Sequence, residues 1–311
     1  MTMRFNGLLP AVKRVFSSSG FFYGVIIVIT ICVVDFKLID TRTKMRRLND
    51  ARPDSLSQLV LLAKGETSTG NIDWRLLQKY FGLVVKYMPN EDISRMFLGI
   101  AEYYTGDKGR TAWDRIQRSA EQDPFLFWNV YNAGVLAFER GDMSLSIRYL
   151  ERALVLPPER VLQVMHTSVL YRQILASTEA DVDIGRDILK AKENVLVLRA
   201  AAYYYAKDHE KARDAALYAL DKVPPQDREP LYFYAGAASI SLNQLPQALS
   251  LLSECINLKS RNPLVYRFSG DILKAMGKAD ESEKLLAIAA SLRSAQEDGF
   301  PYARRLGLKF L

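Results

Sequence analysis

The chain has 311 residues, 49% hydrophobic and 25% charged, which is the composition of an ordinary folded protein. Its two cysteines are too few for a disulfide framework or a cysteine-based zinc site, and its two histidines leave little for a histidine-metal centre. We therefore expect neither a metal nor a cofactor.

The net charge of +7 comes almost entirely from the first 53 residues. These residues include nine Lys or Arg and three Asp or Glu, whereas residues 54–311 include 33 basic and 32 acidic residues. A nucleic-acid-binding domain needs its own basic face, because neutralising phosphates supplies most of its affinity. The balanced body therefore argues against nucleic acid as a partner.

An uncharged segment interrupts this basic region. Residues 15–34 have the sequence VFSSSGFFYGVIIVITICVV, and twenty helical residues span about 30 Å, the thickness of a hydrocarbon core. The alternative is a cleaved signal peptide with Arg4, Lys13 and Arg14 as its basic end, but no small residues follow the apolar stretch. We expect a basic tail at 1–14 and an uncleaved transmembrane helix at 15–34.

A basic juxtamembrane segment at 35–57 follows the apolar stretch. Four of its residues are expected to contact lipid headgroups: Arg42, Lys44, Arg46 and Arg47. Lys and Arg are more numerous after the apolar stretch than before it, which favours a body in the cytoplasm. A short basic N-terminus retained inside favours the opposite orientation. We expect a single-pass protein of the inner or cytoplasmic membrane with a cytoplasmic body, and the other orientation stays open.

Residues 58–296 contain a repeat of 34 residues. Gly236 and Gly270 are 34 residues apart, and Gly134 precedes Gly236 by three such periods. After each glycine come Gly or Asn at +7, a small residue at +12, Leu at +16 and a small residue at +19. Small residues let two helices approach closely, the leucine fills the space between them, and Gly or Asn at +7 adopts the left-handed conformation that ends the first helix.

This pattern resembles the tetratricopeptide repeat, a helix–turn–helix unit. The resemblance implies an all-α solenoid of about seven helix pairs at 58–296, whose units bury their faces against one another and form a concave groove. Further units are expected at about 58–92, 93–126, 161–192 and 193–228, although 161–192 lacks the small-residue signature. Residues 297–311 form a C-terminal tail that we expect to cap the last unit; docking on a partner is the alternative.

In this family the first helix of each unit lines the groove. The matching positions are aromatic or apolar in the middle of the array and charged towards its C-terminus. The implied protein-binding groove consists of Phe97, Tyr104, Trp128, Tyr131, Phe138, Tyr204, Tyr205, Phe233, Arg267 and Lys274. The alternative is that the aromatic side chains pack between adjacent units. The Lys and Asn that clamp a terminal carboxylate in chaperone-binding members of the family are replaced here by apolar residues.

No sequence motif for catalysis or nucleotide binding is present, and we expect no enzyme. His166 lies in an apolar run and His209 at a turn between two helices, so neither indicates a catalyst. We expect a membrane-anchored scaffold that binds protein partners and helps to assemble or stabilise a membrane-associated complex. The alternative is a structural subunit that self-assembles into a ring or oligomer within a secretion, motility or biogenesis machine.

Overall fold

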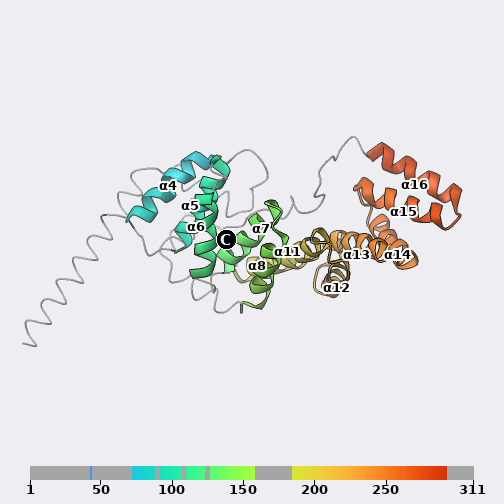
Figure 1. Ribbon diagram of the computed structural model, residues 1–311, viewed down its shortest axis with the longest axis horizontal. Helices are drawn as coiled ribbons and strands as arrows, with labels where there is room; N and C mark the ends of the chain where they lie inside the picture. Colours follow the sequence, from blue (N-terminus) through green and yellow to red (C-terminus); the bar gives the residue numbers. More distant parts are fainter. Residues whose placement is uncertain are drawn as a thin grey trace, which may run out of the picture. The chain divides into compact units, whose positions relative to one another are not determined.

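The computed structural model describes residues 72–87, 92–106, 110–122, 127–157 and 184–292, together with Thr43. Within these ranges all regular structure is helical, with eleven α-helices, one short 3₁₀ helix and no strand (Figure 1). The helices are α4 (Trp74–Tyr87), α5 (Asp92–Thr105), α6 (Arg110–Gln122), α7 (Phe127–Glu139), α8 (Met143–Val155), α11 (Ile184–Tyr205), α12 (His209–Leu220), η1 (Pro225–Asp227), α13 (Glu229–Ser241), α14 (Leu245–Asn257), α15 (Pro263–Ala275) and α16 (Ala279–Leu292).

The helices pack as consecutive pairs. Helices α5 and α6, α7 and α8, α11 and α12, α13 and α14, and α15 and α16 each form a hairpin whose two members contact each other. The second helix of each pair also packs on the first helix of the next described pair, so α6 contacts α7, α8 contacts α11, α12 contacts α13 and α14 contacts α15. This order of contacts confirms the all-α, tetratricopeptide-like solenoid within the described residues.

The glycine and the leucine of the repeat meet in each of the three clearest units. A Cβ atom added to the glycine would lie 2.9 Å from the leucine sixteen positions later, closer than real Cβ contacts. The pairs are Gly134–Leu150, Gly236–Leu252 and Gly270–Leu286. Where position +12 is serine, its hydroxyl donates to the carbonyl of the same glycine, at 2.9 Å from Ser146 and 2.8 Å from Ser282. The missing side chain therefore brings the two helices of a pair together.

In the pair α5/α6 the close approach falls one residue earlier than the repeat spacing predicts. The spacing aligns Ile100 with the repeat glycine, but it is Gly99 whose added Cβ would lie 2.9 Å from Ile116. The carbonyl oxygen of Ala112 would lie 3.2 Å from the same Cβ, so backbone as well as side chain fills this space. The irregular spacing explains why this unit matches the pattern less well.

The turns inside the pairs follow the predicted chemistry. Gly141, Asn243 and Gly277 have φ angles of 80°, 58° and 79°, in the left-handed region. At the first of these turns the N–H of Gly141 donates to the carbonyl of Phe138 at 3.0 Å, and that of Asp142 donates to Ala137 at 2.9 Å. These bonds satisfy carbonyls that the end of a helix leaves without partners.

The turn between α11 and α12 has the same geometry with a different residue. Lys207 has a φ of 63°, although a side chain makes the left-handed conformation unfavourable by about 1–2 kcal/mol. Asp208 follows and caps α12, with its carboxylate accepting a hydrogen bond from the N–H of Lys211 at 3.3 Å. The backbone at Lys207 therefore adopts the left-handed turn of the repeat although Gly or Asn, which favour this conformation, is absent.

One unit boundary predicted from the repeat count is wrong. Separate units are expected at 161–192 and 193–228, but α11 runs without interruption from Ile184 to Tyr205. After Gly185 this helix contains neither glycine nor proline to end it. Helix α8 packs directly on α11, and the ammonium of Lys192 donates to the carbonyl of Leu154 at 3.1 Å. The pairs α7/α8 and α11/α12 are therefore neighbours in the array.

The predicted transmembrane helix at 15–34 and the tail at 297–311 lie outside the described residues, as do most of the juxtamembrane segment and residues 158–183. In the part of the chain that the structure describes, no helix combines the length and the apolar character needed to span a bilayer.

Replacing Gly236 with Ala should destabilise the array. The new methyl group would lie 2.9 Å from Cγ of Leu252, a side chain with no exposed surface, and such overpacking costs about 1–3 kcal/mol. Gly82→Ala in α4 is the matched control, because nothing lies within 4 Å of its added Cβ and alanine favours a helix by about 1 kcal/mol. Thermal unfolding followed by helix content should show a lower midpoint for Gly236→Ala and an unchanged or higher one for Gly82→Ala. Equal midpoints would contradict the proposed packing.

Candidate protein-binding surface

Aromatic side chains link the first helices of four consecutive pairs. Phe138 of α7 contacts Tyr205 of α11 edge to face, with ring centroids 5.8 Å apart. Tyr205 lies 6.2 Å from Tyr234 of α13, and Phe233 stacks on Phe268 of α15 at the same centroid distance. With Tyr204, which lies 5.8 Å from Tyr234, these residues form what we call the aromatic row. The row follows the helices that the family resemblance assigns to the groove.

Five predicted groove residues are buried. Each is at most 2% exposed, and the set consists of Phe97, Trp128, Tyr131, Phe138 and Phe233. Trp128 and Tyr131 contact Phe127 and each other, and Tyr131 also interacts with Asn194 of α11. The expectation that these five side chains line an open groove is thereby corrected, because aromatic rings pack against the neighbouring helices and leave no surface for a partner.

Three predicted tyrosines are only half-buried. Tyr104 of α5 stacks on Trp74 of α4 with centroids 4.5 Å apart, and its hydroxyl donates to the carboxylate of Glu139 at 2.9 Å. Tyr204 and Tyr205 lie at the end of α11, where each keeps part of its ring at the surface. A partly exposed tyrosine joined to a rigid aromatic network loses little side-chain entropy on binding, which favours such residues in interfaces.

The two predicted basic residues are exposed on α15. Arg267 and Lys274 are seven residues apart, which places them on one face of the helix. Asp271 lies between them and faces Arg267 at 4.0 Å, with more than half of each side chain exposed. An exposed ion pair of this kind contributes little to stability. Because Arg267 and Lys274 are both exposed, both cations are accessible to an acidic group on a partner.

The remaining sequence predictions divide between described and undescribed residues. Arg42, Lys44, Arg46 and Arg47, predicted at the lipid headgroups, lie outside the described residues, as does His166. His209 is half-buried beside Tyr204, with ring centroids 5.6 Å apart. No group of three or more His, Cys, Asp or Glu side chains within the described ranges could hold a metal ion.

The candidate surface therefore consists of the exposed parts of Tyr204 and Tyr205 on α11 and of Arg267 and Lys274 on α15. Half-buried Ile240 of α13 and Phe268 of α15 are further members. The sequence pattern missed Phe268 and Tyr234, although both occur on first helices next to predicted groove positions.

Comparison with known proteins adds weak structural likenesses only. No protein-family model and no curated protein matches the sequence. A crystal structure of MamA protein is 16% identical, covers 67% of this chain and 94% of its own, and has a TM-score of 0.49. MamA from Desulfovibrio magneticus RS-1, from residue 41 to its end, is 11% identical, with coverages of 67% and 98% and a TM-score of 0.49. YrrB, a TPR protein with an unusual peptide-binding site, is 12% identical, with coverages of 70% and 93% and a TM-score of 0.47.

Alkaline pH should unfold the array through its buried tyrosines. Burial raises the pKa of Tyr80 to about 12, and burial with the hydrogen bond to Glu151 raises that of Tyr203 to about 12. Burial also raises the pKa of Tyr131. The neutral phenol is therefore favoured in the folded chain, and its contribution to stability is complete below about pH 10 and is lost as the pH rises towards 12.

Exposed tyrosines should ionise first, and the remaining tyrosinate absorbance should appear only together with the loss of helix content, above about pH 10. Ionisation of every tyrosine while the helix content stays constant would contradict the burial of the aromatic side chains.

Proposed function

We propose that the protein is a membrane-anchored scaffold that binds other polypeptides along the first helices of its repeats. The observation that carries this proposal is the aromatic row, which is continuous across α7, α11, α13 and α15 and remains partly exposed at Tyr204 and Tyr205. The rigid array holds the exposed parts of Tyr204, Tyr205 and Phe268 in a fixed register on α11 and α15, which suits an extended peptide or a partner helix.

The character of the surface changes along the array. Tyrosine rings dominate on α11, whereas α15 presents Arg267 and Lys274. A segment that carries an apolar stretch followed by acidic residues would complement this order. Since the described residues hold no candidate metal cluster and the sequence has no catalytic motif, we propose a non-enzymatic role in assembling a membrane-associated complex.

The membrane association is proposed from the uncharged residues 15–34 and the basic residues that follow them. An anchor of this kind raises the concentration of the binding surface near the bilayer and so favours partners that are also membrane-associated. We propose that the repeats lie on the cytoplasmic side, because Lys and Arg are more numerous after the apolar stretch than before it.

The anchor can be tested by fractionation. The full chain should remain in the membrane pellet after alkaline carbonate extraction, whereas a chain lacking residues 15–34 should be released, because no other helix among those described could span the bilayer. In spheroplasts, protease added outside should leave the repeats intact. Release of the full chain by carbonate would contradict the anchor, and digestion of the repeats would reverse the orientation.

Site-specific photo-crosslinking tests the binding surface. A photoreactive residue in place of Tyr204, Tyr205 or Arg267 should capture the same partner in native membranes. Tyr218 on α12 is the matched control: its side chain is 58% exposed, but it belongs to a second helix. Charge reversal of Arg267 and Lys274 together should lower the yield at Tyr205, because both cations are exposed. Equal capture at Tyr218 and Tyr205 would argue against a surface confined to the first helices.

A further inference from the structure

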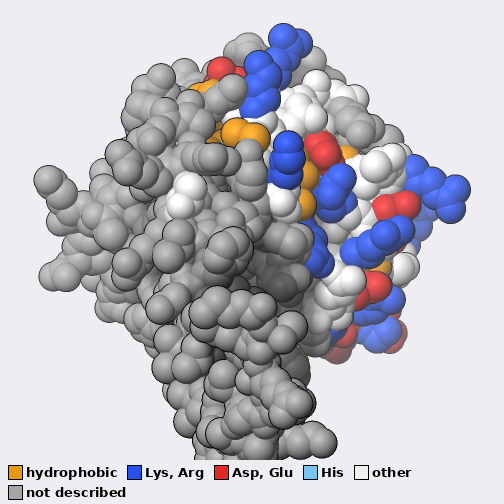
Figure 2. All heavy atoms as spheres, turned by 90° about the vertical axis from the view of Figure 1, so that its left-hand side faces the viewer, with side chains coloured by type: hydrophobic (Ala, Val, Ile, Leu, Met, Phe, Trp, Pro, Cys, Tyr) orange, Lys and Arg blue, Asp and Glu red, His pale blue; other side chains and the backbone are white. Residues whose placement is uncertain are grey.

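Helices α4, α5 and α6, at the N-terminal end of the described array, present several exposed Lys and Arg side chains. Figure 2 shows Lys and Arg side chains gathered on the described part of one face of the molecule. The exposed members on these helices are Arg75, Lys79, Lys86, Arg110 and Arg118.

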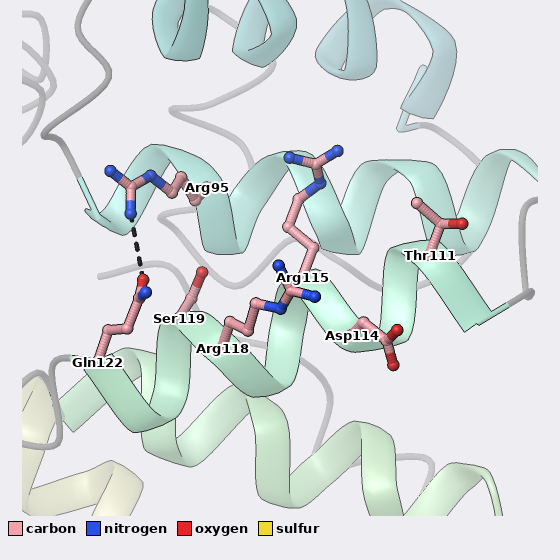
Figure 3. A pocket seen from close by; sticks show the side chains of 7 residues that line it. All are labelled: Arg95, Thr111, Asp114, Arg115, Arg118, Ser119 and Gln122. Carbon is pink, nitrogen blue, oxygen red and sulfur yellow. Dashed lines mark hydrogen bonds between the residues drawn. The ribbon is translucent and has the colours of Figure 1, made fainter.

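A cavity of about 300 Å³ lies between α5 and α6 on this part of the array (Figure 3). Arg95 reaches it from α5, and six residues of α6 complete its lining. Thr111, Arg115, Arg118 and Gln122 recur at intervals of three or four residues and therefore follow one face of α6.

Two of the three arginines in the pocket are held in place by neighbouring side chains. Arg115 extends from α6 to α5, where its Nε donates to the carboxylate of Glu102 at 3.0 Å, and its side chain is only 32% exposed. At the other end of the pocket, Nη1 of Arg95 donates to the amide oxygen of Gln122 at 3.1 Å (Figure 3). A guanidinium group fixed in this way needs little further ordering to bind a ligand.

The third arginine supplies a more exposed cation. Arg118 is exposed and has no ion pair with any described residue, whereas Asp114 faces Arg110 at 4.0 Å. Among the described residues, Glu102 is paired with Arg115 and Asp114 lies nearest Arg110, so the guanidinium of Arg118 stays available for a ligand. The hydroxyl groups of Thr111 and Ser119 add neutral hydrogen-bond donors.

We propose that this pocket binds carboxylate side chains of an acidic peptide segment on a protein partner. Guanidinium groups bind carboxylates with two parallel hydrogen bonds, and three of them around one cavity can hold more than one acidic residue. Arg115 is recessed between the helices, so a side chain that enters the pocket reaches it better than a flat layer of lipid headgroups does. The site uses the second helix α6 and is independent of the surface proposed on the first helices α11 and α15.

The test uses the full chain in detergent and fluorescein-labelled hexaglutamate, with hexaglutamine as the neutral control. Fluorescence anisotropy should show binding of hexaglutamate only, weakened by added salt. Arg118→Glu should raise the Kd by about tenfold or more, because it reverses the most accessible charge of the pocket. Lys190→Glu on α11 is the matched control, since Lys190 is also an exposed helical cation, and it should bind like the unaltered chain.

The same Kd for Arg118→Glu and Lys190→Glu would overturn the proposal. So would failure of hexaglutamate to bind while glycerophosphoserine, a soluble lipid headgroup, binds and loses affinity in Arg118→Glu, because the pocket would then be a lipid site. Substitution of Tyr204 with the photoreactive residue should leave hexaglutamate binding unchanged. Failure of this site and failure of the crosslinking surface can therefore be distinguished.

Discussion

The close approach of the two helices in each pair is the constraint on which the array depends. A glycine on the first helix accepts a leucine from the second, and the leucine fills the volume that a Cβ atom would need. Because the contact recurs at Gly134, Gly236 and Gly270, the two helices approach equally closely at this point in the pairs α7/α8, α13/α14 and α15/α16. Uniform hairpins can then stack second helix on first helix, which produces the regular contacts from α12 to α16.

The features that the sequence predicted well are those determined within one hairpin. Glycine, leucine and the left-handed residue at +7 interact over fewer than twenty positions, so their spacing alone specifies the pair. Lys207 shows the limit of this approach, since its turn is imposed by the helices on either side rather than favoured by its own side chain. The boundary near residue 193 failed for a related reason: a count of periods cannot detect that α11 continues through it.

The binding surface could be predicted only in part, because exposure depends on contacts between hairpins. Trp128 and Tyr205 both occupy first-helix positions that match the family groove, yet Trp128 is fully buried and Tyr205 is half-buried. Phe127 and Tyr131 of the same helix contact Trp128. Tyr131 also interacts with Asn194 of the next described pair, whereas Tyr205 lies at the end of α11. The contact with the next pair is not contained in the pattern of a single repeat. Aromatic side chains thus serve two purposes in this array: buried ones pack between hairpins, and half-buried ones are available to a partner.

This double use of aromatic residues separates stability from recognition along the array. Where the rings are enclosed, as in α7, substitution removes packing and is expected to affect the fold first. Substitution of the exposed cations of α6 and α15 is expected to affect binding rather than the fold, because an exposed charge contributes little to stability but strongly directs association. Arg118 and Arg267 can therefore change with little effect on the fold, whereas enclosed aromatic residues such as Trp128 and Tyr131 cannot. In an array of this kind, partner specificity would reside in exposed charged positions such as Arg118 on α6 and Arg267 on α15 rather than in the enclosed rings.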